Sequence, residues 1–91
     1  MTWFVLEMRY VDAERRQQNR ERHLEYLRGL AAEGVLVAAG PWTEGLGSLT
    51  VYDVPSVERA RELVEADPYL TNGVTEILTL REWNPVVRRD A

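Results

Sequence analysis

Apolar and polar residues alternate over the first ten positions, and this period of two predicts a β-strand from Thr2 to Tyr10. Three further segments are predicted as strands, at residues 35–39, 46–54 and 74–83. The run at 35–39 is continuously apolar, which is typical of a strand buried on both faces. Gly40-Pro41 is predicted to close that strand with a turn.

Two segments have the three-to-four-residue periodicity of amphipathic helices. The longer one begins after Asp12, a favourable N-cap, and runs to about Glu33, where Gly34 ends it. The second follows the N-cap Ser56 and ends at Asp67-Pro68, because the residue before a proline is pushed out of the helical region. The buried stripe of the longer helix is predicted to contain Leu24, Leu27, Leu30 and Ala31.

The elements follow the order β-α-β-β-α-β, which predicts a single domain over residues 1–84 and a flexible tail over residues 85–91. The economical fold is an α+β, ferredoxin-like sandwich, with a four-stranded antiparallel sheet in the order 4-1-3-2 and both helices on one face. Trp3 and Val5 make the other face apolar as well. We therefore expect a homodimer, in which a second copy covers the open face of the sheet.

Composition excludes several classes of site. The 91 residues include no cysteine and one histidine, so thiol chemistry is excluded and neither a metal nor a cofactor is expected. All eleven basic residues are arginine, which excludes a Schiff base on lysine. The net charge of −4 argues against nucleic-acid and anionic-membrane surfaces. The sequence has neither a membrane-length apolar run nor a signal-peptide pattern, and a cytoplasmic protein is expected.

The single histidine, His23, lies inside the longer helix and is the first candidate for chemistry. At about 100° per residue it falls within roughly 40° of Leu27 and points with the apolar stripe. Arg20 and Arg16 lie on the same sector, one and two turns earlier. The inward face of this helix is therefore polar in its N-terminal half, and those side chains must meet solvent or polar partners.

The predicted topology brings His23, Arg20, Gly40-Pro41, Gly47-Ser48 and Asp67 to one end of the sheet. A histidine paired with an aspartate suits proton abstraction, because the carboxylate fixes the imidazole tautomer and supports its positive charge. Arg20 would hold an anionic ligand, Gly40-Pro41 would permit close backbone approach, and Ser48 would offer a hydroxyl or an N–H group.

Each of these assignments has a purely structural alternative. His23 would then be a half-buried histidine with a local partner, and Arg20 a solvated helix charge. Asp67 would be a helix terminator with local hydrogen bonds, while Gly40-Pro41 and Gly47-Ser48 would be a turn and the start of a strand.

Taken in order, these motifs resemble the YciI-like family of YCII-related domains over nearly the whole chain. The resemblance rests on Arg20-x-x-His23, Ala39-Gly40-Pro41, Gly47-Ser48, Asp67-Pro68-Tyr69 with Gly73, and Trp83. It implies a ferredoxin-like, dimeric α/β barrel, related in shape to muconolactone isomerase, with a site that pairs His23 and Asp67. One branch of the family, the chloromuconolactone dehalogenases, eliminates HCl from a lactone. The turn between Pro41 and Gly47 is shorter here than in many members.

Three functions fit this sequence. In the first, a small cofactor-independent lyase or isomerase uses His23, supported by Asp67, to abstract a proton from a small carbonyl, lactone or acid. Its substrate-binding residues are predicted to be Arg20, Gly40, Pro41, Ser48 and Tyr69. In the second, a non-catalytic dimeric module binds a small anion or metabolite in the same pocket. In the third, the dimer is structural or regulatory and the pocket is vestigial.

Overall fold

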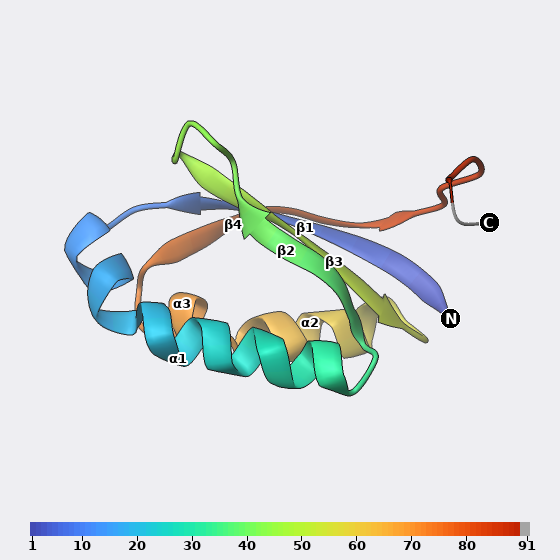
Figure 1. The fold of residues 1–91 in the computed structure, drawn as a ribbon, viewed down its shortest axis with the longest axis horizontal. Helices are drawn as coiled ribbons and strands as arrows, with labels where there is room; N and C mark the ends of the chain where they lie inside the picture. The colour runs from blue at the N-terminus through green and yellow to red at the C-terminus, as the bar shows by residue number, and fades with distance from the viewer. Residues whose placement is uncertain (90–91) are drawn as a thin grey trace.

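The computed structural model describes residues 1–89, which form four strands and three helices (Figure 1). In chain order the elements are β1 (Thr2–Tyr10), α1 (Ala13–Ala32), β2 (Leu36–Pro41), β3 (Gly47–Val54), α2 (Val57–Glu65), α3 (Pro68–Thr71) and β4 (Thr75–Trp83).

The four strands form one antiparallel sheet in the order β2-β3-β1-β4. All three helices lie on one face of this sheet, and no helix covers the other face (Figure 1). The predicted α+β class, the β-α-β-β-α-β frame and the strand order are therefore confirmed.

The core lies between the sheet and the helices. On β1 the alternate residues Phe4, Leu6 and Met8 are buried, as the period of two predicted. They pack with apolar residues of β3, α1 and α2: Leu27, Leu30, Tyr52, Val54, Ala60, Leu63 and Val64. Burial of these side chains is the main favourable contribution to the stability of so small a domain.

The helix-facing side of β3 changes character along the strand. Tyr52 and Val54 pair with Phe4 and Thr2 and lie in the core, whereas Ser48 and Thr50 pair with Met8 and Leu6. The side chains that face α1 therefore become hydroxylic toward the start of β3. This polar end of the sheet faces the polar half of α1.

The strand predicted at residues 35–39 was expected to be buried on both faces, and this expectation is wrong. β2 is an edge strand with β3 as its single neighbour, and most of it is exposed, including Val37 at 44%. Gly40 and Pro41 belong to the strand and do not form the predicted turn, which begins after them. Proline has no backbone N–H group to donate. It is tolerated in an edge strand, because one side of that strand has no neighbouring strand to accept a hydrogen bond.

Two further details differ from the sequence prediction. Ala31 is exposed, and the half-buried Tyr26 packs against the core from α1 instead. The short helix α3 was not predicted; α2 ends at Glu65, and Asp67 is the N-cap of α3. Four residues with a single proline carry too little periodicity to predict a helix from sequence.

The segment after β4 belongs to the predicted tail. Within it the Arg88 guanidinium lies 4.6 Å from the centre of the Trp3 ring. Residues 90 and 91 of the tail lie outside the described part of the chain, and the flexibility of the tail stays a prediction. None of the helices within residues 1–89 has the length and apolar character needed to span a bilayer.

Candidate active site

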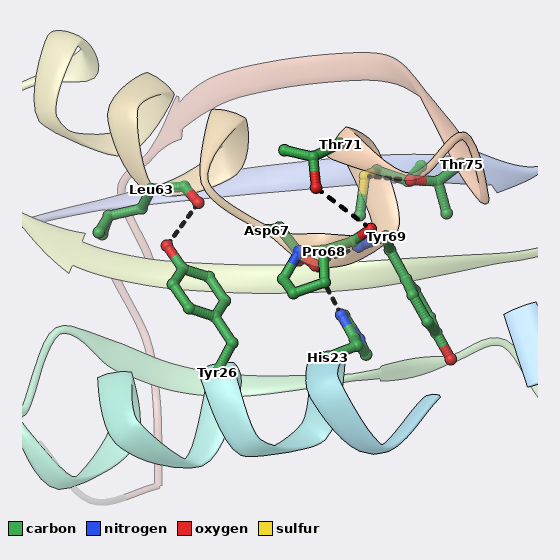
Figure 2. Close-up of polar contacts among 9 residues, drawn as sticks. His23, Tyr26, Leu63, Asp67, Pro68, Tyr69, Thr71 and Thr75 are labelled. Atoms are coloured by element: carbon green, nitrogen blue, oxygen red, sulfur yellow. Dashed lines mark hydrogen bonds and ion pairs between the residues drawn. The ribbon is translucent and has the colours of Figure 1, made fainter. Parts of the chain in front are cut away.

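His23 and Asp67 lie in hydrogen-bond contact between α1 and the start of α3 (Figure 2). The distance from His23 Nδ1 to Asp67 Oδ1 is 2.8 Å. The Asp67 side chain is 1% exposed and the His23 side chain 13%. Helical phase turns His23 inward, and the chain reversal at Asp67 brings the carboxylate to meet it.

The position of Asp67 is fixed by a second hydrogen bond. The backbone N–H of Tyr69 donates to the same oxygen, Asp67 Oδ1, at 2.9 Å. Asp67 had been expected to end a helix, where the helix dipole disfavours an acid; instead it caps the N-terminus of α3, where a carboxylate is favourable. The Pro68 ring at the first position of α3 suits that helix start.

Tyr69 covers one face of the imidazole. The two rings lie face to face (Figure 2). Their centroids are 3.6 Å apart and their planes differ by 2°. Since Asp67 holds the ring through Nδ1 and Tyr69 packs against its face, the imidazole has little rotational freedom. When Nδ1 carries the proton that it donates to Asp67, Nε2 is left with a lone pair.

A second aromatic group extends this cluster. The ring of Tyr10 meets the Tyr69 ring edge-on at a centroid distance of 6.2 Å, and the Arg16 guanidinium lies 3.8 Å from the centre of the Tyr10 ring. Burial raises the pKa of Tyr69 above its ordinary value of 10.0, and a hydrogen bond from the Arg16 side chain opposes this rise.

These residues surround a cavity of about 120 Å³ between α1 and the polar end of the sheet. Most of the predicted site residues line it: Arg20, His23, Gly40, Pro41, Ser48 and Tyr69. Asp67 does not line the cavity, because it is buried on the Nδ1 side of His23. Gly47 does not line it either; a Cβ there would collide with the carbonyl oxygen of Met8.

The sequence analysis did not name three polar residues of the cavity wall as site residues: Tyr10, Arg16 and Thr50. Helical phase had placed Arg16 on the inward sector with Arg20 and His23, but no ligand-binding role was predicted for it. Tyr10 ends β1, and its position depends on the tertiary arrangement of β1 beside α3. Thr50 could have been found from the period of two that also places Ser48.

The chemistry available at this site is proton transfer and anion binding. His23 offers one free ring nitrogen, and Arg16 and Arg20 supply positive charge. Within residues 1–89, no group of three or more histidine, cysteine or acidic side chains gathers where a metal ion could bind.

Sequence comparison identifies the family. The sequence model of the YCII-related domain matches residues 1–84. The chain belongs to the YCII-related domain family. It is also 35% identical over 82 residues to the uncharacterized protein YjpA of Bacillus subtilis (strain 168). The aligned residues cover 90% of this chain and 93% of YjpA.

A solved structure has a similar fold. It is the 5-chloro-2-hydroxyhydroquinone dehydrochlorinase TftG from Burkholderia phenoliruptrix AC1100, in complex with 2,5-dihydroxybenzoquinone. The TM-score is 0.76 at 22% sequence identity, and the match covers 90% of this chain and 93% of TftG. At this identity the likeness establishes the common fold.

Proposed function

We propose that this member of the family is a small cofactor-independent enzyme, in which His23 abstracts a proton from a small carbonyl, lactone or acid substrate. The observation that carries the proposal is the 2.8 Å contact between His23 and the buried Asp67, with His23 on the wall of a cavity. A dehydrochlorinase of the same fold, TftG, supports a reaction of the elimination class.

In the proposed reaction, the Asp67 carboxylate accepts a hydrogen bond from the Nδ1–H group of His23, which keeps the proton on Nδ1 and leaves the Nε2 lone pair for the substrate. Nε2 takes a proton from a carbon next to a carbonyl group, and the electron pair of that C–H bond forms the new double bond. In an elimination the leaving group departs with its own bonding pair. In an isomerisation the imidazolium returns the proton to another carbon of the substrate. Ser48 would donate a hydrogen bond to the substrate oxygen that gains negative charge.

The test is proton loss that depends on His23. Chloride release from 5-chloro-2-hydroxyhydroquinone, and deuterium uptake from D2O by a panel of lactones and 2-oxo acids, would be measured for the wild type, His23→Ala and Asp67→Asn. We expect turnover in at least one assay and a loss of about 10²-fold or more in His23→Ala. Asp67→Asn can keep the N-cap of α3 but loses the charge that supports the imidazolium, and we expect a similar fall.

A matched control is Ser56→Ala, which removes the N-cap of α2 away from the cavity and should leave the rate per folded molecule unchanged. Proton loss at the same rate in wild type and His23→Ala would contradict the proposal. Binding of these compounds without any His23-dependent proton loss would favour the non-catalytic module.

We also propose that the functional unit is a homodimer formed through the open face of the sheet. This face carries Trp3, Val5 and Leu49, with Val51 buried among them and Trp83 48% exposed. The Trp3 and Trp83 rings lie 5.8 Å apart. No helix of residues 1–89 covers this face (Figure 1), and its exposed apolar side chains are unfavourable in water. The same face also carries the ion pair of Glu7 and Arg81, 3.6 Å apart.

Multi-angle light scattering would test the dimer. We expect twice the monomer mass at micromolar concentration. A stable interface typically buries about 1,600 Å² in total. Val5→Arg places a charge in the middle of the open face and should dissociate or aggregate the protein. Val57→Arg makes the same change at an exposed position on α2 and serves as the control. A monomer mass for the wild type would overturn the dimer.

A further inference from the structure

Arg16 and Arg20 both line the cavity, yet their surroundings differ. The Arg16 guanidinium lies 3.8 Å from the centre of the Tyr10 ring. No carboxylate among residues 1–89 pairs with it. The Arg20 side chain is 61% exposed and its Nη1 lies 3.7 Å from Glu21. Arg16 is therefore the less exposed of the two cations, and among residues 1–89 its charge lacks an acidic partner.

The wall of the cavity is positively charged, whereas the protein as a whole is negatively charged. The chain carries a net charge of −4, but the ionisable side chains of the cavity wall are Arg16, Arg20, His23 and two tyrosines, with no acid among them. Asp67 neighbours His23 on its far, buried side. A half-buried guanidinium without a carboxylate favours an anion from outside the chain.

We propose that Arg16 anchors the carboxylate group of a small substrate in this cavity. The inference rests on the proposed function, whose substrate class it narrows to carboxylic acids. A guanidinium presents two parallel N–H donors that match the two oxygens of a carboxylate. The Tyr10 ring lies 3.8 Å from the guanidinium carbon and holds it by a cation–π contact.

The size of the cavity limits the rest of the ligand. A cavity of ~150 Å³ accommodates one benzene ring, and the cavity here measures about 120 Å³. The cavity is smaller than one that holds benzene, so the body of the carboxylate is at most about one ring. With its carboxylate at Arg16, such a body would extend along the cavity wall toward His23, which lies two helical turns further along α1.

Benzoate and its neutral counterpart benzamide are suitable probes. His23 is the single histidine of the chain, so its imidazole C–H resonance is unambiguous and reports binding by NMR at constant pH. We expect benzoate to shift this resonance in the wild type and to bind about tenfold or more tightly than benzamide. Arg16→Met should weaken benzoate binding about tenfold or more, and Arg16→Lys, which keeps charge without the planar fork, by less.

Variants of neighbouring residues distinguish specific binding by Arg16 from the general effect of positive charge in the cavity. Arg20→Met should weaken benzoate binding less than about threefold. Tyr10→Phe keeps the ring beneath the guanidinium and should bind benzoate like the wild type, whereas Tyr10→Leu should lose part of the affinity. Benzamide carries no charge, so in each variant that retains the wild-type circular dichroism spectrum its binding should change less than that of benzoate.

The inference would be overturned if benzoate failed to bind the wild type, if it bound no better than benzamide, or if Arg20→Met weakened it more than Arg16→Met. These outcomes are distinguishable from failure of the proposed function. If no His23-dependent proton loss is found, benzoate would still bind through Arg16. If Arg16 is not the anchor, His23-dependent turnover would persist and Arg16→Met would bind benzoate normally.

Discussion

The two halves of helix α1 lie against the same face of one sheet and pack in opposite ways. In the C-terminal half, Leu27 and Leu30 are buried in the core, and the Tyr26 hydroxyl donates to the carbonyl oxygen of Leu63 at 2.7 Å. Toward the N-terminus, Arg16 lies beside a cavity, which reaches His23 at the middle of the helix. The facing strand β3 changes in the same direction, from Tyr52 and Val54 to Ser48 and Thr50. The cavity therefore depends on the sequence of β3 as well as on that of α1.

This difference shows how a small domain separates stability from function. The apolar half of α1 contributes burial, which scales with the area removed from water. The polar half leaves space unfilled and holds charged groups away from bulk water, which lowers stability but creates a site. Substitutions in the two halves should therefore have different consequences.

The largest effect on stability is expected for Leu30→Ala in the apolar half. Leu30 is buried in the core, and removing its side chain leaves a cavity that the fixed backbone cannot close. We expect a loss of about 2–5 kcal/mol in the free energy of unfolding, measured by urea denaturation. Leu24→Ala, at a half-buried position on the cavity wall, should lose less than half as much. Equal losses at the two positions would contradict the proposal that the two halves of α1 contribute differently to stability.

Asp67→Ala and His23→Ala compare the two partners of the polar half. Asp67 is buried, accepts from His23 and caps α3, so its removal should lower the free energy of unfolding by about 1–3 kcal/mol. For His23→Ala we expect a change below about 1 kcal/mol, or a gain, because Asp67 keeps the bond from the Tyr69 N–H group and active-site residues commonly lower stability. Thermal denaturation would measure both.

The opposite order would assign His23 a structural role. A loss in His23→Ala as large as that in Asp67→Ala would mean that the histidine mainly satisfies the buried carboxylate.

Much of the fold could be predicted because local signals agree with one another. The period of two in β1, the N-caps Asp12 and Ser56, and Gly34 with its φ of +79° after α1 all point to the observed elements. The position of β2 was already implied by the strand order. Its burial was predicted wrongly because a continuous apolar run does not reveal whether a neighbouring strand exists.

The candidate site was predictable where helical phase and topology determine it. His23 and Asp67 are 44 residues apart, yet the element order alone brings them to the same end of the sheet. The aromatic cluster was not predictable in the same way. The stacking of Tyr69 on His23 depends on α3, and the contact of Tyr10 with Arg16 depends on how the end of β1 lies against α1.

The smallest effect at neutral pH is expected at Tyr52, which lies between the two halves on β3. Its ring is fully buried, and its hydroxyl has no hydrogen-bond partner among residues 1–89. Tyr52→Phe removes this hydroxyl without changing the ring, so the free energy of unfolding at pH 7 should change by less than about 1 kcal/mol.

At alkaline pH the same substitution should matter. Burial, and then the nearby Asp67 and Tyr26, raise the pKa of Tyr52 well above its ordinary value of 10.0. The folded state therefore retains this proton while the unfolded state loses it, so the stability contributed is complete below pH 10 and declines as the pH rises above it. Burial raises the pKa of Tyr26 and Tyr69 in the same direction, so part of the decline would remain in Tyr52→Phe. Between pH 8 and pH 11, the melting temperature of Tyr52→Phe should fall less steeply than that of the wild type. Identical slopes would mean that folding does not raise the pKa of the Tyr52 hydroxyl.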